Sequence, residues 1–180
     1  MAGVARWPGH IAAGVTSDAL VSALDMMPTF AAVAGAALPP NREFDGMDIT
    51  PVLLGNASAG HAQLFHPLSG QWGQWGKLGG VRVGDYKGIY LTGGSFDCQD
   101  RLGNLGHHDP PLVFNLREDP AEAHALDTTT AAGKDIVARI EAAKAAKLAS
   151  IASSPRSTVD WSSNTDDEPC CNAALPACRC

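Results

Sequence analysis

Neighbouring histidine and aspartate side chains in one predicted loop are the first candidates for chemistry. His107, His108 and Asp109 stand immediately before Pro110. Imidazole and carboxylate groups bind metal ions, so this run could hold a metal or form part of the rim of a substrate pocket. Histidines in loops are more often simply solvated, and the sequence leaves these alternatives open.

Two tryptophans are candidates for the same pocket rim. Trp72 and Trp75 lie in the segment GQWGQWG, whose glycines predict a flexible aromatic pair. The two rings could face a sugar or an aryl group, or they could fold back over the edge of a sheet. His61 and His66 bracket a predicted strand, and their spacing of five residues directs them to opposite faces. The sequence therefore argues against a metal ion shared by these two histidines.

The cysteines are concentrated at one end of the chain. Four of the five lie in the last eleven residues, as Cys170, Cys171, Cys178 and Cys180, whereas Cys98 stands alone in a predicted loop. Paired disulfides are favoured in the tail because zinc-binding cysteines usually have two to four residues between them. An odd count leaves one thiol without a partner, so Cys98 is either bonded to a cysteine elsewhere or a small buried hydrophobe.

Charge and composition exclude several classes of partner. A formal net charge of -6 over 180 residues offers no basic field for nucleic acid or for an anionic membrane. No apolar run approaches the roughly 20 residues that span a bilayer. The first ten residues do not read as a signal peptide. Asn56-Ala-Ser58 is an N-glycosylation sequon in a predicted exposed loop.

Local patterns predict a strand and two helices in the first third of the chain. Residues 4–7 predict a short strand, closed by Pro8-Gly9. Ser22 and Asp25 have the character of a capping box, so we expect a helix from there to Gly35, with Pro28 either in its first turn or at a bend. Leu24, Met27, Phe30, Ala31 and Ala34 fall on one face of that helix. Thr50-Pro51 begins one more turn, over residues 52–54.

The rest of the chain predicts a small antiparallel sheet followed by a helix. The predicted strands cover residues 63–66, 78–83, 86–92 and 112–116, with a two-residue turn at Gly84-Asp85. A helix is predicted over residues 130–150, because apolar side chains recur along one arc, at Ile136, Val137, Ile140, Ala143 and Leu148. Charged side chains lie outside that arc, at Lys134, Glu141, Lys144 and Lys147. A helix across four strands gives an α+β subdomain.

Several segments, in this order and spacing, resemble the arylsulfatase A-like branch of the sulfatase family. RWPGHI (6–11), SDALVSALDMMPTFAAVAGAALP (17–39) and FDGMDITPVLLG (44–55) are similar to the last piece of that family's catalytic domain. VRVGDYKGIYLTGG (81–94) and PPLVFNLREDPAEAHAL (110–126) are similar to strands that follow it, and the cysteine tail is similar to the end of the family's chains.

The resemblance implies the fold class and the division of the chain. Residues 1–58 would be the end of the sulfatase, alkaline-phosphatase-like, α/β domain. Residues 59–150 would form a four-stranded antiparallel sheet with a packed C-terminal helix, and residues 151–180 a flexible cysteine-rich tail. Because the rest of the α/β sheet would cover them, the apolar faces of residues 4–7 and 22–34 are expected to be exposed in this chain.

The resemblance also implies an activity, hydrolysis of sulfate esters. The family converts a Cys or Ser in Cys/Ser-x-Pro-x-Arg to formylglycine and uses a calcium or magnesium ion. Ser153-Ser-Pro-Arg-Ser157 has its arginine one place too early, and Asp166-Asp167 follows no apolar strand. We therefore expect no catalytic residue and no metal ligand here, and no activity of this chain alone.

The resemblance finally implies a compartment and partners. The family's counterpart of Cys98 bonds to a cysteine of the catalytic domain, and the proteins are lysosomal or extracellular. The loop ahead of Cys98 has no histidine, although the family can supply a pocket histidine there. A sulfate-ester substrate and homo-oligomer contacts would belong to the full-length parent. The alternative is a non-catalytic sulfatase remnant that acts as a binding or oligomerisation module, and an upstream reading frame carrying the nucleophile motif would distinguish the two.

Overall fold

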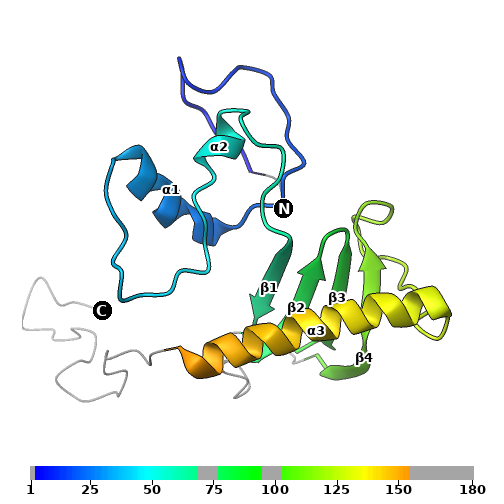
Figure 1. Ribbon diagram of the computed structural model, residues 1–180. Helices are drawn as coiled ribbons and strands as arrows, with labels where there is room; N and C mark the ends of the chain where they lie inside the picture. The colour runs from blue at the N-terminus through cyan, green and yellow to red at the C-terminus, as the bar shows by residue number, and fades with distance from the viewer. Residues whose placement is uncertain (1–2, 69–76, 95–102, 155–180) are drawn as a thin grey trace, which may run out of the picture.

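The computed structural model describes residues 3–68, 77–94 and 103–154. An N-terminal part carries the short 3-10 helix η1 (Ala23–Asp25) and the helices α1 (Met26–Val33) and α2 (Thr50–Leu53). A four-stranded sheet follows, and the long helix α3 (Ala131–Ser153) lies across it (Figure 1). The predicted four-stranded antiparallel sheet with a packed C-terminal helix is confirmed.

The sheet is an antiparallel meander with the strand order β1-β2-β3-β4. Its strands are β1 (Gln63–Pro67), β2 (Leu78–Val83), β3 (Tyr86–Thr92) and β4 (Gly106–Asn115). Val83 pairs with Tyr86 across the two-residue turn, and Gly84 has φ 58° there. Glycine adopts this left-handed conformation without steric cost, so the Gly84-Asp85 pair sets the hairpin register.

Strand β4 begins six residues earlier than predicted, and this corrects the assignment of residues 106–111 to a loop. Leu91 pairs with His107 and Ile89 with Leu112, with an irregularity in the register between Ile89 and Leu91. The predicted strand began only after Pro110-Pro111, and proline lacks the N–H donor that strand pairing uses. An edge strand tolerates them, since its outer side needs no donor.

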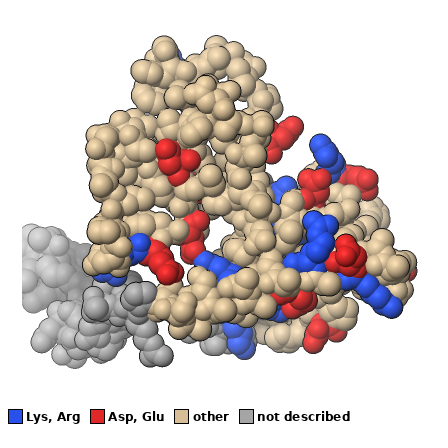
Figure 2. Space-filling model, in the orientation of Figure 1, with Lys and Arg blue, Asp and Glu red and all other residues tan. Residues whose placement is uncertain are grey.

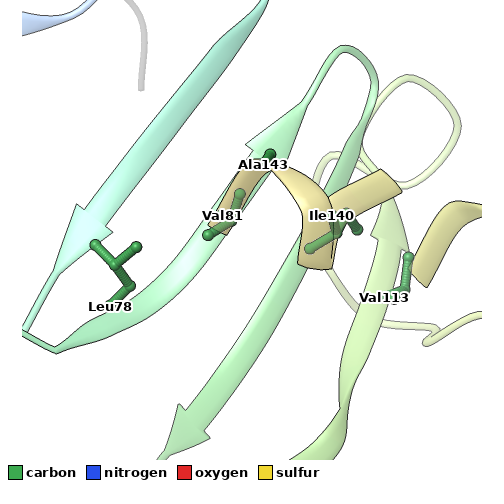
Figure 3. Packing of buried hydrophobic residues seen from close by; sticks show 5 residues of the cluster. All are labelled: Leu78, Val81, Val113, Ile140 and Ala143. Atoms are coloured by element: carbon green, nitrogen blue, oxygen red, sulfur yellow. The ribbon is translucent and has the colours of Figure 1, made fainter. Parts of the chain in front are cut away.

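The hydrophobic core lies between the sheet and α3. Val81 and Val113 of the sheet meet Ile140 and Ala143 of the helix, and Leu78 completes the cluster (Figure 3). A Cβ at Gly88 would lie 3.0 Å from the Cγ2 atom of Ile140, so glycine lets the helix approach the strand closely.

The N-terminal end of α3 follows from local sequence, whereas its C-terminal end and the exposure of one apolar side chain differ from the prediction. Thr130 caps the helix, with its side chain accepting a hydrogen bond from the Gly133 amide. The helix extends to Ser153, three residues beyond the prediction. Leu148 was expected on the buried arc but is exposed, because the last turns of α3 extend beyond the sheet (Figure 1).

The first predicted strand is absent from the structure. Residues 4–7 are irregular, and no described residue pairs with them as a neighbouring strand. A strand needs a partner for its backbone groups, so extended sequence character alone does not create one. The capping box of Ser22 with Asp25 is confirmed, and Pro28 lies in the first turn of α1.

The apolar stripe of α1 is exposed, as expected for a face that another surface would cover. On α1, Phe30 is 64% exposed and Met27 is also exposed, and Leu24 of the preceding η1, which continues this stripe, is 58% exposed. The buried residues of this segment are instead Asp25, Pro28 and Thr29. In Figure 2 the N-terminal part shows mostly uncharged surface, whereas charged side chains gather over the sheet and α3.

One buried carboxylate holds three segments of the N-terminal part together. Asp25 is 0% exposed and accepts hydrogen bonds from the amides of Ser22 at 2.6 Å and Met47 at 2.9 Å. Nε2 of His61, just ahead of β1, lies 2.7 Å from Oδ1 of the same carboxylate. A Cβ at Gly46 would lie 2.0 Å from the Leu24 carbonyl oxygen, so glycine is needed for this approach.

Hydrogen bonding decides the charge state of Asp25. Burial acts to raise the pKa of this carboxyl, but the hydrogen bonds from Met47, Ser22 and His61 outweigh burial and hold the pKa below its ordinary 3.8. The ionised form is therefore the one that the fold stabilises. One ion pair and one hydrogen bond connect the same part to the end of α3: Lys147 pairs with Asp45, and the Ser154 hydroxyl donates to Glu43.

We predict that Ile140→Ala lowers the free energy of unfolding by about 2–5 kcal/mol, because it leaves a cavity in the core. Ile140 is 0% exposed, whereas Ile151, on the same helix, is 46% exposed. Ile151→Ala is the matched control and should cost much less. Urea unfolding of both variants checks this, and equal losses would show that Ile140 does not lie in the core.

We predict that Asp25→Asn weakens the N-terminal part by about 1–3 kcal/mol, because the buried donors lose their ionised acceptor. Hydrogen exchange of the Ser22 and Met47 amides should become about tenfold to a hundredfold faster. The stabilisation is present above pH 3.8 and is lost as the pH falls through the lower pKa of the folded state, so it should disappear at acid pH in the unsubstituted chain.

The exposed Asp18 provides the matched control for that experiment, since it makes no side-chain hydrogen bond to a described residue. Asp18→Asn should leave both amides unchanged. Unchanged exchange in Asp25→Asn would contradict the role given to this carboxylate.

Candidate functional site

The structure places His107 and His108 on β4, next to each other and therefore on opposite faces of the strand. His107 is exposed, and Nε2 of His108 lies 2.8 Å from the Thr92 hydroxyl on β3. The prediction that both stand in a loop is wrong, because pairing with β3 extends the strand through them. Neighbours that diverge in this way are poorly placed to bind one metal ion together.

The described residues form no cluster that could bind a metal ion. Across residues 3–68, 77–94 and 103–154, no three His, Cys, Asp or Glu side chains come close enough to hold an ion. His61 lies ahead of β1 and contacts Asp25, whereas His66 lies on β1, so these two do not form a pair. We assign no metal ligand to this part of the chain.

His66 belongs to a basic group on the face of the sheet that α3 does not cover. The register aligns Arg82 with Lys87 across β2 and β3 on that face. Partial burial, followed by the positive charge of Lys87, lowers the pKa of His66, and Glu122 opposes this. Lys87 is itself paired with Glu122 at 2.6 Å. This group therefore has its own internal charge partner.

A second polar cluster joins β3 to α3 and was not foreseen from the sequence. The Tyr90 hydroxyl donates to Glu141 at 2.7 Å, and Nζ of Lys144 lies 3.5 Å from the centre of the Tyr90 ring. Burial, and then the hydrogen bond to Glu141, raises the pKa of Tyr90, which keeps its proton. The prediction that Glu141 and Lys144 lie outside the packed arc missed this, because the signal is a contact between residues 51 apart in the sequence.

The serine considered as a nucleophile is part of a helix. Ser153 is the last residue of α3, and its hydroxyl donates to the Ser150 carbonyl at 2.9 Å. Helix α3 thus includes a residue that was expected in a flexible tail. The exclusion of Ser153 as a catalytic group stays a prediction.

Several predicted residues lie outside the described part of the chain. These are the two tryptophans and all five cysteines: Trp72, Trp75, Cys98, Cys170, Cys171, Cys178 and Cys180. The disulfides and the aromatic part of the pocket rim stay predictions. Asn56 is described, and it is exposed in a turn after α2. Among the described residues, no helix has the length and apolar composition that crossing a membrane requires.

Comparison with known proteins places this architecture in a family. The family model described as the C-terminal region of aryl-sulfatase matches residues 59–180. Arylsulfatase G of Canis lupus familiaris is 45% identical over 98% of this chain and 33% of its own length. Arylsulfatase A of Bos taurus is 35% identical over 98% of this chain and 37% of its own, and steryl-sulfatase of Rattus norvegicus is 33% identical over 99% and 34%.

A solved structure shows the same fold. The PsFucS1 sulfatase from Pseudoalteromonas sp. superimposes with a TM-score of 0.69 at 23% identity, covering 86% of this chain and 30% of that one. The chain spans about a third of the length of the curated relatives that it matches. The motifs, the sheet with its helix and these comparisons agree: the chain belongs to the sulfatase family and corresponds to the C-terminal portion of an arylsulfatase.

Proposed function

We propose that this chain is the C-terminal part of a sulfuric ester hydrolase and that residues preceding it in the full-length protein supply the reacting groups. The observation that carries the proposal is the exposed apolar stripe of α1, formed by Met27 and Phe30 and continued by Leu24 of the preceding η1. Large exposed apolar side chains on one helix face usually mark a surface that another part covers. The chain's share of its relatives' length supports a preceding domain as that part.

The proposed division of labour follows from what the reaction needs. Sulfate-ester hydrolysis requires a nucleophile for sulfur, groups that neutralise the anionic transition state and an acid for the leaving oxygen. We assign none of these roles to a described residue. Formylglycine and a calcium or magnesium ion, as in the family resembled, are proposed for the preceding part. This chain would pack beside that part as a structural support.

The proposed cellular compartment rests on the cysteines. Four cysteines in the last eleven residues suit an oxidising environment, so we propose a lysosomal or extracellular location for the full-length protein. Cys98 would then bond to a cysteine of the preceding domain, which would leave the four tail cysteines to pair among themselves.

We predict that the purified chain does not hydrolyse a chromogenic aryl sulfate, with calcium or magnesium present, above the rate in buffer. A longer protein that includes the preceding residues should do so and should lose the activity in a chelator. The chelator should not change the unfolding of the chain alone. Turnover by the chain alone would mean that a nucleophile operates within these residues.

We also predict that residues before Ser58 exchange their amide hydrogens faster than residues 63–148, because the apolar stripe of α1 has no described surface against it. In the longer protein, protection of residues 22–34 should rise. Equal protection of both regions in the chain alone would contradict the claim that α1 lacks its packing partner.

A further inference from the structure

The turn that follows α2 carries a modification motif that sulfate-ester hydrolysis does not use. Asn56-Ala57-Ser58 is the one Asn-x-Ser/Thr sequence in the chain. All three residues are exposed, and the preceding Gly55 has φ 75° with no atom within 4 Å of where its Cβ would be. Helix α2 therefore ends by directing this turn into open space.

Hydrogen bonds hold the backbone of this turn, whereas the side chains of Asn56 and Ser58 make no hydrogen bond to a described residue. The amides of Asn56 and Ala57 both donate to the Pro51 carbonyl, at 2.8 and 3.0 Å. Neither the Asn56 amide group nor the Ser58 hydroxyl hydrogen bonds to a described residue. The structure thus holds the acceptor nitrogen at a defined position on the surface without using it.

We propose that Asn56 is an N-glycosylation site and that the turn after α2 faces solvent in the full-length protein. The co-reactant is an oligosaccharide linked to a polyprenyl diphosphate. A bond forms between Nδ2 of Asn56 and C1 of the first sugar, the bond from C1 to the diphosphate breaks, and the amide nitrogen gives up a proton. The proposal requires entry into the secretory pathway but not hydrolytic activity.

The position of the turn agrees with the proposed docking surface. The Ile49 amide, just before α2, donates to the Thr29 hydroxyl at 3.1 Å, so α2 lies on the buried side of α1 (Figure 1). At 100° per residue, Met27 and Phe30 project about 160° and 100° away from Thr29. A bulky, hydrated glycan at Asn56 would therefore leave the apolar stripe of α1 free for the preceding domain.

The test is translation of the full chain, behind a cleavable signal peptide, in a cell-free system with microsomes. Only the protease-protected fraction is scored, so every scored chain has reached the lumen. The expected result is one step of reduced mobility that peptide N-glycosidase F reverses. Asn56→Gln, Ser58→Ala and Ala57→Pro should each abolish the step, and Ser58→Thr should keep it.

A protected chain without the step would overturn the proposal. The solvent-facing position is tested separately, on glycosylated chain secreted from eukaryotic cells. Its thermal unfolding midpoint should agree within about 2 °C with that of the deglycosylated chain, because the side chain contacts no described neighbour. A glycosylated chain that fails to fold would contradict the placement of this turn at the surface.

Discussion

The arrangement of the N-terminal part depends on one buried carboxylate. An ionised group without water must be hydrogen bonded on both oxygens, and Asp25 meets this condition with two amides and one imidazole from three separate segments. The start of the helical segment, the loop at Met47 and the approach to β1 are thereby held at one point. Because these segments otherwise bury few apolar side chains, this polar contact sets where the N-terminal part stands relative to the sheet.

The sheet and α3 are held by a different physical principle. Their contact is apolar and close, with Ile140 seated over Gly88 and against Val81 and Val113. Such packing depends on burial and shape rather than on charge, so it does not need the N-terminal part to be complete. Polar contacts at His61 and at the end of α3 connect the two parts.

The sequence predicted the features whose cause is local. The bounds of β2 and β3 were correct because the strand pattern and the Gly84-Asp85 turn lie within fifteen residues, and the capping box needs only residues 22–25. The strand at residues 4–7 was wrong because pairing is a property of two segments. The contact of Asp25 with His61, 36 residues away, could not be foreseen, since neither residue signals its partner.

The candidate site was less predictable than the fold for the same reason. The sequence predicted His107 and His108 as possible metal ligands in a loop, because Pro110 suggests that no strand runs through this segment. Only the pairing of β4 with β3 shows that the two side chains lie on opposite faces of a strand. Among the described residues, the buried Asp25 is already paired with His61, and the partly buried Lys87 is paired with Glu122.

A catalytic site needs the opposite arrangement, with charged groups that converge on an empty position and await a substrate. In the described part, the ion pairs of Asp25 with His61 and of Lys87 with Glu122 instead connect segments of the chain to each other. Removal of the Asp25 contacts is therefore expected to loosen the N-terminal part, because three of its segments meet at this carboxylate. This contrast is the physical argument behind the proposal that residues preceding this chain supply the reacting groups.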